Sequence, residues 1–152
     1  MDIIRKSTMS FKNILVPFDL SSPSNKAFKV ALDLAQKYDS KITLITCVEG
    51  DAWHHKFYDA RADTQLLKAQ TKVAKKYMEK LEETANKVGI KIKLQIIKST
   101  SVAKDIATFA KSRKMDIIVI SSHGRTGFDK LVLGSVANGV IQRTSVPVLL
   151  IK

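Results

Sequence analysis

The chain has 152 residues, of which 45% are hydrophobic and 26% charged, so it is long enough for one globular domain with a sizeable core. No apolar run approaches the roughly 20 residues of a membrane-spanning helix, and the N-terminus lacks the apolar core of a signal peptide. The single cysteine, Cys47, excludes an internal disulfide bond and agrees with a reducing compartment. We therefore expect a cytoplasmic protein without a membrane partner.

The chain is strongly basic: 26 Lys and Arg residues against 14 Asp and Glu give a formal net charge of +12. A basic balance is found in proteins that bind nucleic acid, anionic membranes or anionic ligands. The lysines here are spread along the chain, without a long block of like charges and without interleaved aromatic residues. This pattern favours a solvated lysine-rich surface, with only weak, non-specific binding of nucleic acid.

Short apolar runs alternate with longer segments of helical spacing. Residues 1–10 carry neither pattern and are expected to form a flexible N-terminal tail, ahead of a single domain over residues 11–152. Residues 117–120 are β-branched throughout, typical of a strand buried on both faces, whereas residues 90–97 alternate apolar and polar, typical of a strand near a sheet edge. The predicted strands are residues 13–16, 41–48, 90–97, 117–120 and 146–151.

Four segments between these strands have apolar residues at helical spacing. Ser24 is the expected N-cap of the first, and Gly89 is expected to end the second. The apolar stripe of the second helix is predicted to comprise Leu66, Val73, Tyr77, Leu81, Ala85 and Val88. The expected helices cover residues 24–38, 64–88, 102–110 and 134–141. Strands that alternate with helices predict an α/β fold: a single-domain, doubly wound, mainly parallel five-stranded sheet with helices on both faces.

The stretch over residues 115–143 contains a candidate anion site. The buried strand at 117–120 is followed by a loop with two glycines, residues 121–127, and a helix opens at Gly134 and Ser135. Backbone N–H groups converge in such a loop, and a helix N-terminus adds partial positive charge. Because open α/β sheets bind ligands at the carboxyl ends of their strands, we interpret the loop as a phosphate cradle. From these residues alone, a surface turn stays open as the alternative.

The spacing of Gly124, nine further residues, Gly134 and Ser135 resembles the nucleotide motif of the universal stress protein family: Gly, two residues, Gly, nine residues, Gly, then Ser or Thr. The chain differs at the first position, where Ser121 replaces glycine. The resemblance covers nearly everything after residue 10 and implies the strand order 3-2-1-4-5. It also rests on Val16-Pro17-Phe18-Asp19, Val48, Ser122-His123-Gly124-Arg125 and Val146-Pro147-Val148-Leu149.

The resemblance implies an adenine nucleotide as the partner and assigns its contacts. Asp19 would accept a hydrogen bond from the adenine amino group or a ribose hydroxyl, although an aspartate there could simply form a turn. Val48 would pack on the base or belong to the core, and Arg125 would reach phosphate oxygens. Ser135 would donate to a phosphate or cap its helix. The predicted nucleotide-binding residues are Pro17, Phe18, Asp19, Val48, Ile120, Ser121, Ser122, His123, Gly124, Arg125, Gly134, Ser135 and Val136.

Two motif positions carry specific expectations. Ser121 is expected to have β-region backbone angles, because a regular strand leads into it, so binding should survive the missing glycine. A bulky residue at Gly134 is expected to abolish binding, because its side chain would project toward the phosphates and any positive φ would be lost.

The sequence lacks the motifs that support rapid phosphoryl transfer. There is no Walker lysine and no acidic pair after the first strand. His123 has no acid, base or nucleophile within its loop, which favours a backbone or phosphate contact. The neighbouring His54 and His55 would point apart, which disfavours a metal site, and Cys47 is interpreted as core. No catalytic or metal-ligating residue is predicted, and whether the protein is an enzyme stays undecided beyond slow ATP hydrolysis at most.

The residues and the resemblance together predict a dimeric cytoplasmic stress sensor or regulator that binds ATP, or else AMP or ADP, with Mg²⁺ on the phosphates. The resemblance implies a homodimer through residues 146–151, because an exposed apolar edge favours aggregation unless it is covered. The alternative is a member of the same fold that acts through protein–protein contacts alone. A nucleic-acid-associated module and an enzyme that uses His123 are two more distant hypotheses.

Overall fold

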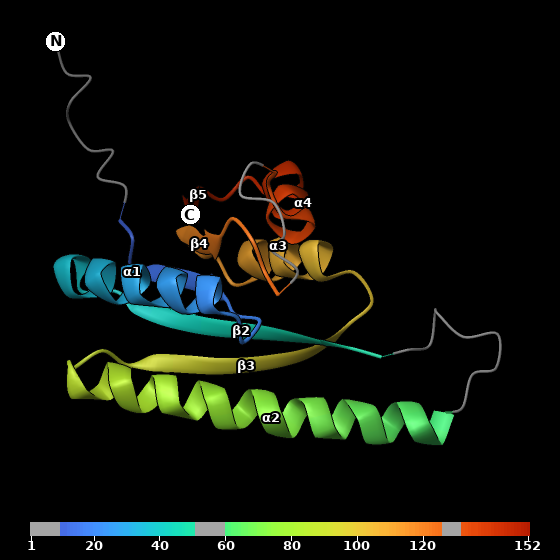
Figure 1. Cartoon of the computed structure of the whole chain (residues 1–152). Coiled ribbons are helices and arrows are strands. Elements are labelled where there is room, and N and C mark those ends of the chain that lie inside the picture. The colour runs from blue at the N-terminus through green and yellow to red at the C-terminus, as the bar shows by residue number, and fades with distance from the viewer. Residues whose placement is uncertain (1–9, 51–59, 126–131) are drawn as a thin grey trace, which may run out of the picture.

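Figure 1 shows the computed structural model, which describes residues 10–50, 60–125 and 132–152. Three predicted features lie outside the described residues: most of the N-terminal tail, the histidine pair and the end of the cradle loop, at residues 1–9, 54–55 and 126–127. None of the helices in the described residues is long and apolar enough to cross a membrane.

Five strands form one sheet in the order β3-β2-β1-β4-β5, and every neighbouring pair is parallel. The predicted α/β class and strand order are therefore confirmed. The loops that follow β1 and β4 meet at one edge of the sheet because these two strands are parallel neighbours. The strands are β1 (Asn13–Pro17), β2 (Lys41–Glu49), β3 (Ile92–Ser99), β4 (Ile117–Ser121) and β5 (Val148–Ile151).

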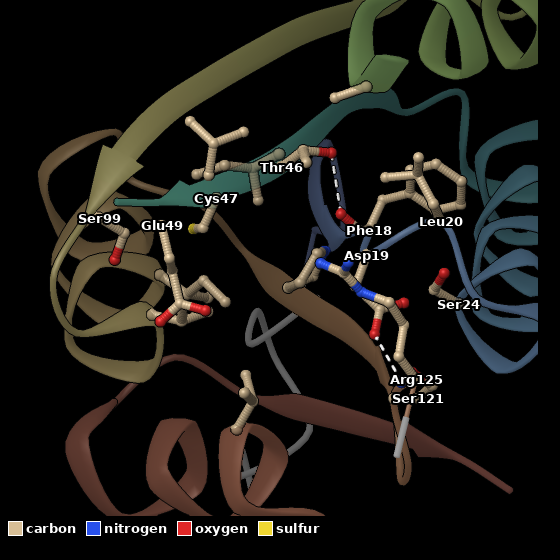
Figure 2. A pocket seen from close by; sticks show the side chains of 18 of the residues that line it. Phe18, Asp19, Leu20, Ser24, Thr46, Cys47, Glu49, Ser99, Ser121 and Arg125 are labelled. Atoms are coloured by element: carbon tan, nitrogen blue, oxygen red, sulfur yellow. Dashed lines mark hydrogen bonds between the residues drawn. The ribbon is translucent and has the colours of Figure 1, made fainter. Parts of the chain in front are cut away.

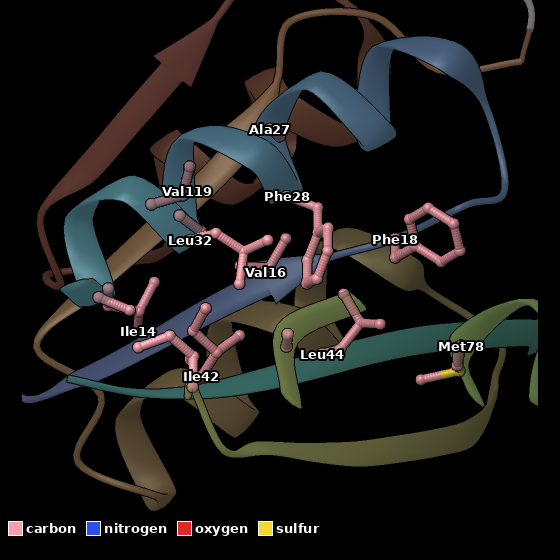
Figure 3. Packing of buried hydrophobic residues seen from close by; sticks show 14 of the residues in the cluster. Ile14, Val16, Phe18, Ala27, Phe28, Leu32, Ile42, Leu44, Met78 and Val119 are labelled. Atoms are coloured by element: carbon pink, nitrogen blue, oxygen red, sulfur yellow. The ribbon is translucent and has the colours of Figure 1, made fainter. Parts of the chain in front are cut away.

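Four helices cover the two faces of the sheet: α1 (Ser22–Tyr38), α2 (Ala60–Lys87), α3 (Val102–Ser112) and α4 (Ser135–Arg143). On one face, Phe28 of α1 and Met78 of α2 belong to the same buried cluster as Val16 (Figure 3). On the other face, Ile106 of α3 and Val140 of α4 belong to a second cluster. Each fully buried side chain of this kind stabilises the fold by about 1.5–3 kcal/mol, so the core rigidly supports the strand ends.

The start of α1 differs from the prediction. Ser21 is the N-cap, and its hydroxyl accepts a hydrogen bond from the backbone N–H of Ser24 at 3.2 Å. The prediction of Ser24 as the cap is wrong by one turn. The physical reason is Pro23, which fits the first turn of a helix, where its missing N–H has no partner to lose. Pro23 therefore belongs to the first turn of α1 and not to the loop before the helix.

The buried face of α2 also differs from the prediction. Leu66, Val73 and Tyr77 of the predicted stripe are 36%, 51% and 47% exposed. Ala85 of the predicted stripe is fully buried and Leu81 packs against the core, as predicted, but Ala74 and Met78, at 2% and 0% exposure, take the place of the other members. Two stripes lie one residue apart on this helix, a rotation of about 100°. Ala74 and Met78 face the sheet, and Val73 beside them borders a cavity.

Smaller differences occur at the strand ends. β3 runs two residues further along the chain than predicted, and β5 begins at Val148 rather than Val146. Pro147 explains the second difference, because it has no N–H to donate to a strand ladder. Its carbonyl oxygen still accepts a hydrogen bond from the N–H of Ile118 at 2.9 Å, which anchors the strand start.

The α3–α4 contact predicts a stability effect at Gly139. A Cβ at this position would lie 2.7 Å from the Cβ of Ala103. Gly139→Ala should therefore destabilise the protein by about 1–3 kcal/mol, even though alanine is the better helix former by roughly 1 kcal/mol. Urea unfolding measures the change. The double variant Ala103→Gly/Gly139→Ala should recover most of the loss, and a more stable Gly139→Ala protein would contradict the close packing.

Candidate functional site

A cavity of about 1050 Å³ opens at the carboxyl ends of the strands (Figure 2). This is the position at which parallel α/β sheets bind their ligands. Its walls come from the ends of β1, β2, β3 and β4, from α2 and from the first turn of α4. All the residues predicted to bind a nucleotide line this one cavity, from Pro17 to Val136. The structure thus brings the predicted residues together, while their binding role stays a prediction.

Asp19 joins two walls of the cavity. One carboxylate oxygen accepts hydrogen bonds from the N–H and the hydroxyl of Ser21, with the N–H at 3.1 Å. The other accepts from the backbone N–H of Arg125 at 3.2 Å. A carboxylate has about four lone-pair sites, so it can still accept a further hydrogen bond from a ligand. Figure 2 shows the Arg125 side chain extending from the β4 loop into the cavity, beside Asp19.

Gly124 fits closely against this carboxylate. A Cβ at Gly124 would lie 2.6 Å from Oδ2 of Asp19, much closer than any real contact. Glycine leaves room for this carboxylate, because a side chain at Gly124 would push Asp19 away from the Arg125 N–H. Gly124 and Asp19, which both belong to the predicted site, thus pack directly against each other.

Gly134 connects the β4 loop to α4. Its N–H donates to the carbonyl oxygen of Ser122 at 2.7 Å, and a Cβ would lie 2.9 Å from that oxygen. Its φ is −59°, so the expectation of a possible positive φ is wrong, and glycine is needed for space. Gly134 holds the N-cap position, and Ser135 is the first residue of α4. The alternative of Ser135 as the helix cap is therefore wrong.

Ser121 and Ser122 lie below the cavity surface at 8% and 4% exposure. Ser121 is the last residue of β4 and is not among the residues with positive φ, which confirms the expected β-region backbone. Ser122 places its hydroxyl 2.9 Å from Nδ1 of the neighbouring His123. The serine that replaces the first motif glycine thus fits the loop without backbone strain.

Sequence reasoning missed the wall formed by α2. Ala69, Gln70 and Val73 line the cavity, although they are far from the motif in sequence. Helix α2 is 28 residues long and β3 only 8, so at about 1.5 and 3.3 Å per residue the helix outruns the strand. The apolar residues at helical spacing on α2 could have indicated this wall, but the same pattern also fits a helix face that packs on the core.

Cys47 is partly buried and packs against the second core cluster, as predicted, and it also lines the cavity. Burial raises the pKa of its thiol to about 12, and the charges of Asp105 and Glu49 add to the effect. Asp105 is held in place by the hydroxyl of Ser99, which donates to it at 2.6 Å. The thiol is thus neutral at physiological pH and unsuited to nucleophilic attack. No cluster of three or more metal-ligating side chains occurs in the described part of the chain.

The raised pKa of Cys47 predicts slow alkylation. Because only the thiolate reacts, iodoacetamide should modify native Cys47 at pH 8 roughly a hundredfold more slowly than the urea-unfolded chain. Mass spectrometry resolves the product, since the protein has one cysteine. The rate should rise with pH up to the folded pKa. Equal rates for the folded and unfolded chains would contradict the desolvated thiol.

Comparison with known proteins matches this geometry to a family. A model of the universal stress protein family matches residues 10–152. A universal stress protein of Methanocaldococcus jannaschii is 32% identical over 156 aligned residues, which cover 99% of this chain and 87% of that protein. The structure of universal stress protein UspA from Lactobacillus plantarum has a TM-score of 0.85 at 26% identity, covering 93% of this chain and 98% of that one.

Two less similar structures are nucleotide complexes. A universal stress protein in complex with cAMP is 20% identical with a TM-score of 0.69, over 94% of this chain and 98% of that one. The universal stress protein from Archaeoglobus fulgidus in complex with dAMP is 21% identical with a TM-score of 0.65, over 94% and 99%. These two show the shared fold. With the family model matching nearly its whole length, the chain belongs to the universal stress protein family.

Proposed function

We propose that this protein binds an adenine nucleotide, with ATP as the leading ligand and AMP or ADP as the alternatives, in the cavity at the carboxyl ends of the strands. The observation that carries the proposal is the contact of Asp19 with the Gly124–Arg125 backbone, beside the N-terminus of α4. A carboxylate acceptor and a helix N-terminus in one cavity complement a nucleoside at one end and phosphates at the other.

The nucleoside end would use Asp19 and Val48. Val48 is 6% exposed at the end of β2 and offers apolar surface to a base, while the carboxylate of Asp19 accepts from an amino or hydroxyl group. Cavities of this kind combine apolar walls with a few placed polar groups. The cavity of about 1050 Å³ lies at the upper end of the usual range for such ligands, so a whole nucleotide fits.

The phosphate end would use Arg125, Ser135 and the first N–H groups of α4. The nine residues of α4 are enough for a helix dipole, and its N-terminus lines the cavity. Mg²⁺ would be carried by the phosphates. The nucleotides in the cAMP and dAMP complexes support an adenine ligand. Hydrolysis would be slow at most, because the sequence has no Walker lysine and no acidic pair after the first strand.

The protein would act as a cytoplasmic sensor or regulator, and we propose a homodimer through the C-terminal edge of the sheet. β5 lies at the end of the strand order, and all four of its residues are only partly buried. An apolar edge strand favours pairing with another strand. Sedimentation equilibrium over a concentration series tests this, and a monomer at every concentration would exclude the dimer.

Mass spectrometry of small molecules released from freshly purified protein tests the proposed ligand. We expect an adenine nucleotide in the released material, and titration calorimetry of ligand-free protein with ATP, ADP and AMP ranks the three. Guanosine triphosphate is the matched control, because it carries the same phosphates. Absence of a released nucleotide together with no heat for any adenine nucleotide would overturn the proposal and favour a purely protein-binding role.

Ser121 gives a more specific prediction. Because its backbone already has strand angles, Ser121→Gly should change ATP affinity by less than about threefold, well within 1 kcal/mol. Calorimetry of the variant and the parent measures the difference. A gain of a hundredfold, about 2.7 kcal/mol, would mean that the serine side chain obstructs the site and would argue for the protein-binding alternative.

A further inference from the structure

Two stretches of the chain, one in α2 and one that includes β3, carry several lysines in a row without an acidic residue between them. In α2, four lysines and no acidic residue lie between Asp63 and Glu79: Lys68, Lys72, Lys75 and Lys76. From Glu83 to Asp105, a stretch that includes β3, five more lysines occur without an acidic residue: Lys87, Lys91, Lys93, Lys98 and Lys104. Figure 1 shows α2 and β3 running side by side, and one cavity is lined by lysines of both elements: Lys68, Lys72 and Lys75 of α2 and Lys98 of β3.

A groove of about 520 Å³ lies between α2 and β3, which we call the α2–β3 groove. Two of its lysines have acidic neighbours: Nζ of Lys98 is 3.8 Å from Asp63, and Nζ of Lys75 is 3.8 Å from Glu79. Lys68 and Lys72 are exposed and form no ion pair within residues 10–50, 60–125 and 132–152. The groove is lined by Thr64, Leu67, Lys68, Thr71, Lys72, Lys75 and Lys98.

The groove reaches an edge of the sheet at Lys98, the one lining residue that belongs to β3 among the described residues. β3 is the terminal strand of the order, so one side of its backbone has no strand partner in the described part of the chain. Lysines on an edge strand prevent pairing with another basic edge, because like charges opposite each other repel. The same lysines attract a strand that carries acidic side chains. Pairing between two β3 edges is therefore disfavoured, whereas pairing of the β3 edge with an acidic segment is favoured.

We propose that the α2–β3 groove docks an extended acidic segment of a partner protein. Carboxylates of the segment would pair with Lys68 and Lys72, and its backbone would run along β3, as in strand addition. Leu67 and the methyl groups of Thr64 and Thr71 would contact the aliphatic parts of the segment. The site lies outside the proposed nucleotide cavity, since the two share no lining residue in the described ranges of the chain.

The lining of the groove favours a peptide over nucleic acid. Among the described residues, the lining contains no arginine and no aromatic side chain, whereas single strands are held by stacking on aromatic rings and by arginine as well as by charge. Lysine provides a point charge that pairs with a carboxylate as readily as with a phosphate. Charge and the adjacent strand edge thus favour an acidic peptide.

Fluorescence anisotropy with a labelled poly-L-glutamate peptide tests the proposal on the full chain at physiological salt. The variant Lys68→Glu/Lys72→Glu should bind the peptide at least about tenfold more weakly than the parent. The matched control is Lys26→Glu/Lys29→Glu on α1, two exposed lysines whose reversal changes the net charge equally. The control should lose less than about threefold. Thermal unfolding of both variants checks that each remains folded.

Amide hydrogen exchange locates the peptide. We expect slower exchange over residues 92–99 in the complex, because a docked strand protects the β3 edge. Failure of the parent to bind the peptide, or equal losses in the two variants, would overturn the proposal. Stronger and groove-dependent binding of oligothymidylate of equal charge would overturn it in favour of nucleic acid, and groove-dependent binding only to phosphatidylserine vesicles would do so in favour of a lipid surface.

Discussion

Gly134→Val is expected to weaken ATP binding by more than a hundredfold, which corresponds to about 2.7 kcal/mol. A Cβ at Gly134 already lies 2.9 Å from the carbonyl oxygen of Ser122 and 3.5 Å from Cα of His123. Both are backbone atoms, so the loop must move away from α4. The movement would break the 2.7 Å hydrogen bond from Gly134 to Ser122 and displace the helix N-terminus that faces the proposed phosphates. Titration calorimetry measures the affinity.

Gly139→Ala is the matched control for this experiment. It introduces a side chain into the same helix, where a Cβ would lie 2.7 Å from Ala103, but Gly139 does not line the cavity. It should lower stability without lowering the affinity of the folded protein. Unchanged ATP affinity in a folded Gly134→Val protein would show that the N-terminus of α4 takes no part in binding.

The sheet was predictable because its signals are local. The β-branched run at Ile117–Ile120 predicts a strand whose two faces are both buried, which occurs in the middle of a sheet. Val119 is indeed fully buried. The face of α2 was not predictable in this way. Ala74 and Val73 differ little in apolar character, and the choice between them depends on the space left between helix and sheet. Periodicity alone therefore identified the helix but not its rotation.

The residues of the cavity also divide into those that the sequence could place and those that it could not. Asp19 and Gly124 could be placed together, because each lies in the loop that begins at the carboxyl end of a buried parallel strand. Gln70 could not be placed there, because its position depends on the length by which α2 outruns β3. The physical reason why Gly134 must be glycine was also hidden. The requirement comes from the Ser122 carbonyl, a contact that exists only once the loop and helix have packed.

Asp19→Ala is expected to reduce ATP affinity by roughly a hundredfold. The carboxylate accepts from Ser21 and from the N–H of Arg125, and hydrogen bonds to a charged group each contribute about 1.5–3 kcal/mol. Alanine removes the proposed acceptor for the nucleoside and also releases the Arg125 backbone from the β1 loop. The loss should thus exceed that of one ligand contact. Asp19→Asn should lose less, because its carbonyl oxygen can still accept from one of the two walls.

Asp33→Ala on α1 provides the control for charge. Asp33 is exposed and does not line the cavity, and its replacement changes the net charge by the same amount as Asp19→Ala. An anionic ligand should be attracted slightly more by either variant, because each becomes more positive. Weaker binding in Asp19→Ala alone would thus run against the change in charge and report the lost hydrogen bonds. Equal affinities of Asp19→Ala, Asp33→Ala and the parent would place the nucleoside away from Asp19.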